Sequence, residues 1–137
     1  MMNPWRAPPQ QPATEVLLPM RNGELSVWLT TKGQAGDPKF YDHVKRSTGK
    51  TIRGVAIASG ENGRGNYPRG VEWFACPIYH KGDKRTNGIV EFYEFCEQCA
   101  QKGDAVIIHC NQSFHRGPVL LSAIGKCAGL DKAVVLE

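Results

Sequence analysis

The chain has 137 residues, of which 41% are hydrophobic and 22% are charged, and its formal net charge is +4. This length and composition predict one soluble globular domain, and no apolar run approaches the ~20 residues that cross a bilayer, so we expect no membrane among its partners. The Lys and Arg residues are dispersed along the chain, so the charge pattern does not call for nucleic acid as a partner.

The amino-terminal stretch is rich in Pro and Gln and lacks the apolar block of a secretory signal. We expect an extended Pro-rich arm over residues 1–22 and a catalytic domain over residues 23–137, because proline removes backbone donors. The five cysteines form an odd set without the spacing of a disulfide framework. Reduced thiols and a cytoplasmic location are therefore the expectation.

Strands and helices alternate along the remainder of the chain. Apolar residues alternate with polar ones over 24–31, which predicts a strand with one buried face. Asp37-Pro38 has the residue types of a helix start, and Gly49 of a helix end. The expected strands are 24–31, 51–59, 71–79 and 105–108, and the expected helices are 38–49, 89–102 and 116–127. This order predicts a single-domain α/β fold, with a central, mostly parallel sheet flanked by helices.

The segment with the clearest chemistry lies between the last strand and the last helix. The strand 105–108 is wholly apolar, as in the middle of a sheet, and a loop after such a strand is where open α/β sheets bind ligands. The amides of this loop, with the start of the helix, would form an anion site. The predicted phosphate-binding residues are Asn111, Gln112, Ser113, Phe114, His115 and Arg116.

Cys110 and Arg116 supply the two functional groups of this loop. The guanidinium of Arg116 is a planar fork that can hold two phosphate oxygens at once. A positive field of this kind also stabilises a thiolate, so Cys110 is the candidate nucleophile. Thiolate attack would give a phosphocysteine that water later cleaves, and this chemistry needs no metal or other cofactor.

His109-Cys110, five further residues and Arg116 resemble the signature of the protein tyrosine phosphatase superfamily, which is Cys-x5-Arg preceded by His. The late position of the loop is most similar to that of the small dual-specificity phosphatases. The resemblance implies a cysteine-dependent phosphatase that acts on phosphotyrosine, phosphoserine or phosphothreonine in phosphorylated proteins. It also implies a general-acid Asp in the loop before helix 89–102, where Asp83 stands.

Asp104 is a poorer candidate for the acid, because six residues of strand place it roughly 20 Å from Cys110.

Two positions depart from the family pattern: Ser113 replaces a usual Gly, and Gly117 replaces a usual Ser or Thr. The loss of that hydroxyl predicts slow hydrolysis of phosphocysteine. A phosphate-binding module with little or no turnover therefore remains an alternative, as does a rhodanese-like sulfurtransferase, which also uses a loop cysteine.

Other conspicuous side chains have more ordinary interpretations. Cys96 and Cys99 lie on the apolar face of a predicted helix, which favours core packing over a metal or redox site. Trp28 and Trp73 are expected to pack in the core. Tyr67, in a Gly-rich loop, is a candidate for the rim of the substrate pocket.

Overall fold

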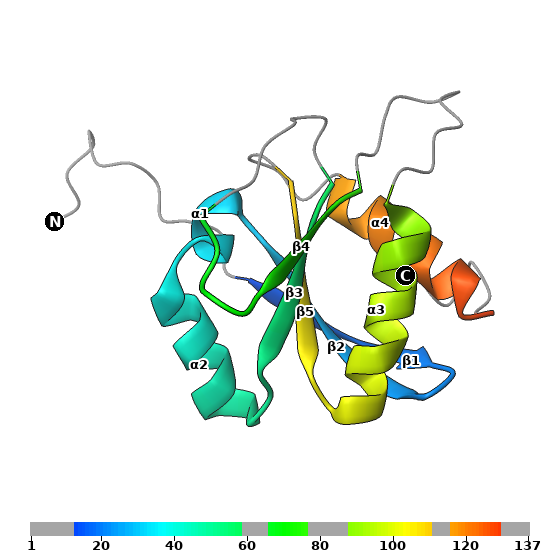
Figure 1. The fold of residues 1–137 in the computed structure, drawn as a ribbon, viewed down its shortest axis with the longest axis horizontal. Coiled ribbons are helices and arrows are strands. Elements are labelled where there is room, and N and C mark those ends of the chain that lie inside the picture. Colours follow the sequence, from blue (N-terminus) through cyan, green and yellow to red (C-terminus); the bar gives the residue numbers. More distant parts are fainter. Residues whose placement is uncertain (1–12, 59–65, 77–87, 111–115, 130–137) are drawn as a thin grey trace, which may run out of the picture.

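The structure is a computed structural model that describes residues 13–58, 66–76, 88–110 and 116–129. It is a single α/β domain in three layers, with helices on both faces of a central sheet (Figure 1). The elements in chain order are β1 (Thr14–Met20), β2 (Gly23–Thr30), α1 (Lys32–Ala35), α2 (Pro38–Thr48), β3 (Ile52–Ile57), β4 (Glu72–Ala75), α3 (Ile89–Lys102), β5 (Ala105–His109) and α4 (Arg116–Cys127).

The sheet has five strands in the order β1-β2-β5-β3-β4. The strands β2, β5, β3 and β4 are parallel, and β1 is antiparallel to β2. Thus β5 lies between β2 and β3, and the last strand along the chain occupies the centre of the sheet. This confirms the expected single α/β domain with a mostly parallel sheet.

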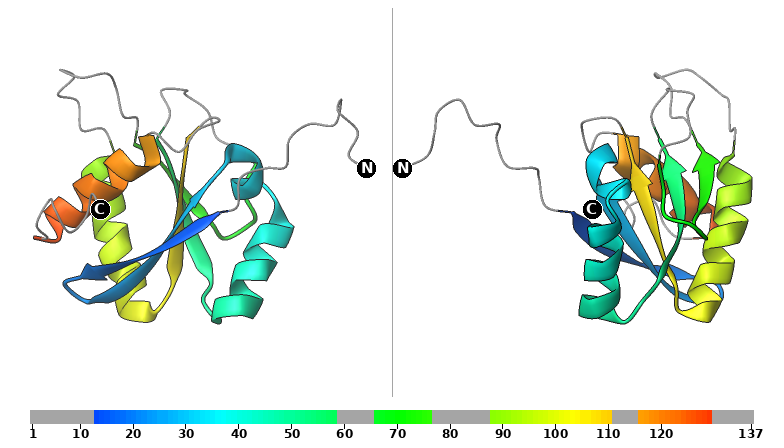
Figure 2. Two further views of the ribbon diagram at one scale, coloured as in Figure 1. Left: turned by 180° about the vertical axis from the view of Figure 1, so that it is seen from behind. Right: turned by 60° about the vertical axis from the view of Figure 1, so that its left-hand side comes forward.

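Each face of the sheet carries its own hydrophobic core. Residues Val106 and Ile108 of β5 pack with α3 and α4, whereas Ala105 and Ile107 pack with residues of α1 and α2. Figure 2 shows α2 and α3 on opposite faces of the sheet. Because both faces are covered, a central parallel strand is apolar throughout, which explains the uninterrupted run in β5.

The expected arm over residues 1–22 is wrong in its second half, because residues 14–20 form β1. Leu18 is buried and Val16 and Met20 pack against the core, while Leu17 is 49% exposed, so the strand alternates. Its Pro19 is tolerated because β1 is an edge strand (Figure 2). The domain therefore includes residue 14 and beyond, and residues 1–12 lie outside the described part.

The turn between β1 and β2 is attached to α3 through one buried carboxylate. Glu97 is 8% exposed and accepts hydrogen bonds from the backbone N–H groups of Arg21 and Asn22, at 3.4 Å and 3.2 Å. The hydroxyl of Tyr93 donates to the same carboxylate. These bonds give hydrogen-bond partners to a carboxylate that would otherwise be costly to bury, and they link the β1-β2 hairpin to α3.

Helix α2 has the expected ends. Its N-cap is Asp37, whose side chain accepts from the N–H of Lys39 at 3.0 Å, and its C-cap is Gly49 with a left-handed φ of 75°. Short α1 was not expected from the sequence. It forms because Thr31 and Gln34 make a reciprocal capping box.

Two further expectations need correction. Strand β2 has both faces covered rather than one, since all residues from Leu25 to Thr30 are buried between the two helical layers. Strand β4 is shorter than the expected 71–79, and Trp73 is 40% exposed at this edge of the sheet instead of packing in the core. Trp28 is buried as expected and makes an edge-to-face contact with Phe40.

Candidate active site

Cys110 directly follows the most enclosed strand of the domain. All five residues of β5 are buried, and Cys110 itself is only 4% exposed. Its backbone position is fixed by its neighbours, because the carbonyl of His109 accepts a hydrogen bond of 2.8 Å from the N–H of Ala58. The cysteine therefore stands on a rigid element, as a catalytic group requires.

The connections that follow the neighbouring strands β2 and β5 leave the sheet on opposite faces. The connection from β2 runs through α1 and α2 on one face, whereas β5 continues into α4 on the other. Adjacent strands whose connections leave to opposite faces open a crevice at their carboxyl ends, and ligands bind there in open α/β sheets. Cys110 thus lies at the topological switch point between β2 and β5 (Figure 1).

The expected site residues are only partly described. Cys110 lies at the carboxyl end of β5, and Arg116 is the first residue of α4, although its side chain is outside the description. Asn111, Gln112, Ser113, Phe114, His115 and Asp83 lie outside the described residues. The structure therefore places the strand before the loop and the helix after it, in the arrangement expected for an anion site.

Cys110 and His109 face opposite sides of the sheet. Cys110 belongs to the core covered by α3 and α4, following Val106 and Ile108. The ring of His109 lies on the other side, where its Nε2 is 2.9 Å from the hydroxyl of Tyr67, a residue that packs against the second core. Its Nδ1 is 3.4 Å from the carbonyl oxygen of Cys110.

These two contacts determine which nitrogen of the His109 ring carries the proton. The Cys110 carbonyl can only accept, so Nδ1 carries the hydrogen, and in the neutral ring Nε2 accepts from the Tyr67 hydroxyl. Burial lowers the pKa of His109 below its ordinary value of 6.5, the bond to Cys110 opposes this shift, and the charge of Lys32 adds to it. The neutral ring therefore predominates at neutral pH and links Tyr67 to the backbone of Cys110.

Three of the other four cysteines are unsuited to act as nucleophiles. Burial raises the pKa of Cys76 to about 12, with a smaller contribution from Glu91. Burial also raises the pKa of Cys99 to about 12 and that of Cys96 well above its ordinary value. The last two pack in the core beneath α3, which confirms the interpretation of the Cys-x-x-Cys pair as core residues.

The segment that contains Asp83 begins and ends on the side of the sheet where the parallel strands have their carboxyl ends, which is also the side on which Cys110 lies. Cys76 follows β4, and its thiol donates to the carbonyl of Gly88, at the start of α3, over 3.3 Å. Gly88 has a φ of 73°, and a Cβ there would lie 2.1 Å from the carbonyl oxygen of Ala75, so only glycine fits. The two ends of the segment are therefore fixed together beside β4.

Asp104 lies at the amino end of β5, the opposite end of the strand from Cys110, as expected. It precedes β5, and its carboxylate is 3.6 Å from Nε of Arg53. Within the described ranges, no group of three or more His, Cys, Asp and Glu side chains is placed to hold a metal ion. Among the same residues, no helix has the length and apolar character needed to cross a membrane.

Two solved structures share this architecture. Tk-PTP, in the crystal structure of its active form, superposes with a TM-score of 0.53 over 80% of this chain and 74% of its own, at 21% sequence identity. A protein from Leishmania major, provisionally assigned as a protein tyrosine phosphatase, gives a TM-score of 0.54 over 92% of this chain and 85% of its own, at 12% identity. This chain has the protein tyrosine phosphatase fold. No protein-family model matches the chain, and no curated protein matches its sequence.

Within the phosphatase fold, two features of the site were not evident from the sequence. Tyr67 was expected only at the rim of a pocket, whereas it contacts His109, 42 residues away, immediately beside the cysteine. Lys32 follows β2 closely enough for its charge to act on the same histidine. Its only sequence signal is its place just after a strand, which many lysines share.

Proposed function

We propose that the chain is a cysteine-dependent phosphatase that hydrolyses phosphate monoesters, with Cys110 as the nucleophile. The observation that carries the proposal is the position of Cys110 at the carboxyl end of the buried central strand, six residues before Arg116, at which α4 starts. Phosphorylated proteins carrying phosphotyrosine, phosphoserine or phosphothreonine are the proposed substrates. None of the five cysteines forms a disulfide, which supports a reducing, cytoplasmic compartment.

The first step of the proposed reaction is attack of the Cys110 thiolate on phosphorus. The sulfur–phosphorus bond forms as the bond from phosphorus to the ester oxygen breaks, and Asp83 gives its proton to that oxygen. The Arg116 guanidinium and the amides of residues 111–116 hold the charge on the transferring group. Water then attacks phosphorus and gives one proton to the Asp83 carboxylate as the sulfur–phosphorus bond breaks, which releases inorganic phosphate and restores the thiolate and the acid.

The length of the connection is sufficient for Asp83 to take part. The end of β4 lies two strand spacings from β5, or roughly 10 Å. Asp83 is five residues before Gly88, and five extended residues span up to about 17 Å. The fixed ends of the segment at Cys76 and Gly88 therefore allow Asp83 to approach the proposed phosphate position.

His109 and Tyr67 act in this proposal as positioning residues. The Nδ1–H of His109 donates to the carbonyl of Cys110, and Tyr67 donates to Nε2, so the pair fixes the backbone from which the loop starts. A short loop that wraps a phosphate depends on the direction in which its first residue leaves the strand. A less ordered backbone at Cys110 is therefore expected to reduce turnover while the nucleophile is still present.

Gly117 favours one alternative function. It is buried in the first turn of α4, and a Cβ at this position would lie 3.4 Å from Leu29 Cδ2 and 3.6 Å from Ile108 Cγ2, which are ordinary contacts. A side chain is thus tolerated at this position, but the hydroxyl that would assist departure of the thiolate is missing. A module that binds phosphate with little turnover is the second candidate for this reason.

The test compares the wild type with Cys110→Ser for hydrolysis of 4-nitrophenyl phosphate between pH 5 and pH 8, with vanadate binding measured on both. We expect turnover that vanadate inhibits and that Cys110→Ser abolishes. Vanadate binding without turnover would favour the phosphate-binding module. Thiocyanate formation from thiosulfate and cyanide, with no vanadate effect, would instead identify a sulfurtransferase.

A further inference from the structure

Lys32 lies beside the proposed phosphate site, on the neighbouring strand connection. Strand β2 ends at Thr30, which pairs with His109 in the parallel register, and α1 begins two residues later at Lys32. Parallel strands are about 4.8 Å apart, so the start of α1 is within roughly 10 Å of Cys110. A lysine side chain can cover much of that distance.

The backbone that carries Lys32 is held in place. The Thr31 hydroxyl accepts from the N–H of Gln34 at 3.1 Å, and the Gln34 side chain accepts from the N–H of Thr31 at 2.9 Å. The hydroxyl of Tyr41 donates to the carbonyl of buried Ala35 over 2.6 Å, which attaches the end of α1 to α2. The four residues of α1 thus form a fixed base for an exposed lysine.

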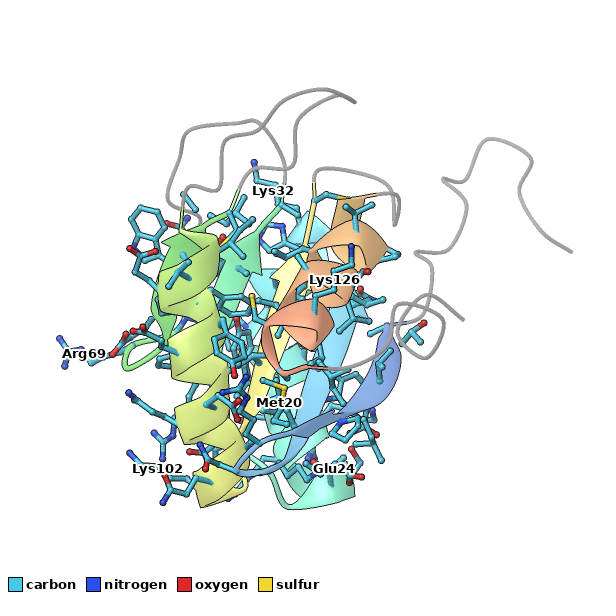
Figure 3. The ribbon with its side chains drawn as sticks, turned by 90° about the vertical axis from the view of Figure 1, so that its right-hand side faces the viewer. Met20, Glu24, Lys32, Arg69, Lys102 and Lys126 are labelled. Atoms are coloured by element: carbon cyan, nitrogen blue, oxygen red, sulfur yellow. The ribbon has the colours of Figure 1, made fainter. Side chains whose placement is uncertain are left out.

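The direction of the side chain agrees with this placement. Figure 3 shows Lys32 at the edge of the molecule where β5 ends, whereas Lys102 lies at the opposite edge. The charge of Lys32 acts on the ring of His109, whose pKa is lowered by burial first and by this lysine in addition. Because the His109 ring contacts the backbone carbonyl oxygen of Cys110, an ammonium group near this ring is also near the backbone of Cys110.

We infer that Lys32 determines specificity by binding a second anionic group of the substrate, next to the scissile phosphate. The inference rests on the proposed function, because that function places the scissile phosphate at Cys110. Arg116 and the loop amides are assigned to the scissile group itself, and the compact ammonium charge of Lys32 suits a neighbouring carboxylate or phosphate. Substrates with two anionic groups close together are therefore the preferred class.

The test uses two aryl phosphates of the same shape, 3-carboxyphenyl phosphate and its neutral counterpart 3-carbamoylphenyl phosphate, with phosphate release as the readout. We expect the wild type to prefer the carboxylated compound in kcat/KM, and Lys32→Ala to lower that preference about five-fold. Lys32→Arg should retain it, and 0.5 M NaCl should weaken it in the wild type, because exposed charges are screened. An unchanged preference in Lys32→Ala would overturn the inference.

Lys102→Ala is the matched control, because it removes an exposed lysine at the end of α3, on the side of the domain opposite to Lys32. An equal loss of preference in Lys102→Ala would assign the effect to net charge and overturn the role of Lys32. If the wild type hydrolyses neither compound, the proposed function fails, and calorimetric binding of the two compounds to the same variants replaces turnover. Tighter binding of the carboxylated compound that is lost only in Lys32→Ala would then support the inference, and any other result would overturn it.

Discussion

Replacing Tyr67 with Phe removes one hydroxyl from the contact that holds the start of the proposed loop. In the wild type this hydroxyl donates to Nε2 of His109 over 2.9 Å, and the histidine is 2% exposed. In Tyr67→Phe the buried nitrogen has lost this donor, and the second link of the ring, to the Cys110 carbonyl, is a long one of 3.4 Å. The substitution should therefore reduce both stability and turnover.

The stability cost follows from the burial of the acceptor. A buried polar atom left without its partner costs about 1–3 kcal/mol, and Tyr67 is only half-buried, so we expect about 1–2 kcal/mol. With a slope of about 1–3 kcal/mol per molar urea for a domain of this size, the unfolding midpoint should fall by about 0.3–2 M. Turnover of 4-nitrophenyl phosphate should fall about ten-fold, because the loop loses its alignment with the substrate.

Urea unfolding followed by tryptophan fluorescence, with steady-state kinetics on the same preparations, measures both effects. Tyr41→Phe is the control, since it deletes a hydroxyl that donates to the Ala35 carbonyl over 2.6 Å on the same face of the sheet. This control should lose comparable stability but keep its turnover within about two-fold. Equal turnover in Tyr67→Phe and the wild type would refute the positioning role of the Tyr67–His109 pair.

Three other changes test the site independently. Because the folded pKa of His109 is lowered, the unfolded chain binds the proton first; stability should fall as the pH drops below about 6.5, by up to about 1.4 kcal/mol per pH unit, and urea midpoints should show a shallower fall in His109→Gln. The same slope in both proteins would exclude a neutral buried histidine. Gly117→Ser should accelerate phosphocysteine hydrolysis, seen as a smaller burst and faster steady state in rapid-quench kinetics; a slower steady state would contradict the assigned effect of the missing hydroxyl. Asp83→Asn should reduce kcat/KM, which reports the formation of phosphocysteine, by about 10²–10⁴-fold for phenyl phosphate and by less for 4-nitrophenyl phosphate, whose leaving group needs no proton. Equal losses for the two esters would remove Asp83 from the role of acid.

The elements that the sequence predicts best are those with complete local signals. Helix α2 carries Asp37 and Pro38 at its start and Gly49 at its end, and β5 is a continuous apolar run. Such signals depend on neighbours within a few residues, so no knowledge of the tertiary structure is required. The order of strand, loop and helix around Cys110 was predictable for the same reason.

The errors come from features that only the assembled sheet determines. The proline cluster before residue 14 and Pro19 within β1 make the second half of the expected arm resemble a loop, although an edge strand accepts a proline. The burial of both faces of β2 depends on α2 covering the second face. The contact between Tyr67 and His109 joins residues 42 apart, and a pairing of this kind has no local pattern.

The central claim is that the sulfur of Cys110 carries the phosphoryl group during turnover. Acid quenching of the enzyme in the presence of 4-nitrophenyl phosphate, followed by peptide mass spectrometry, measures this directly. We expect a phosphate adduct on the peptide that contains Cys110, accumulated because Gly117 lacks the assisting hydroxyl, and none in Cys110→Ser. Turnover that continues in Cys110→Ser, or a wild type that turns over while phosphate is attached to another residue, would contradict the account.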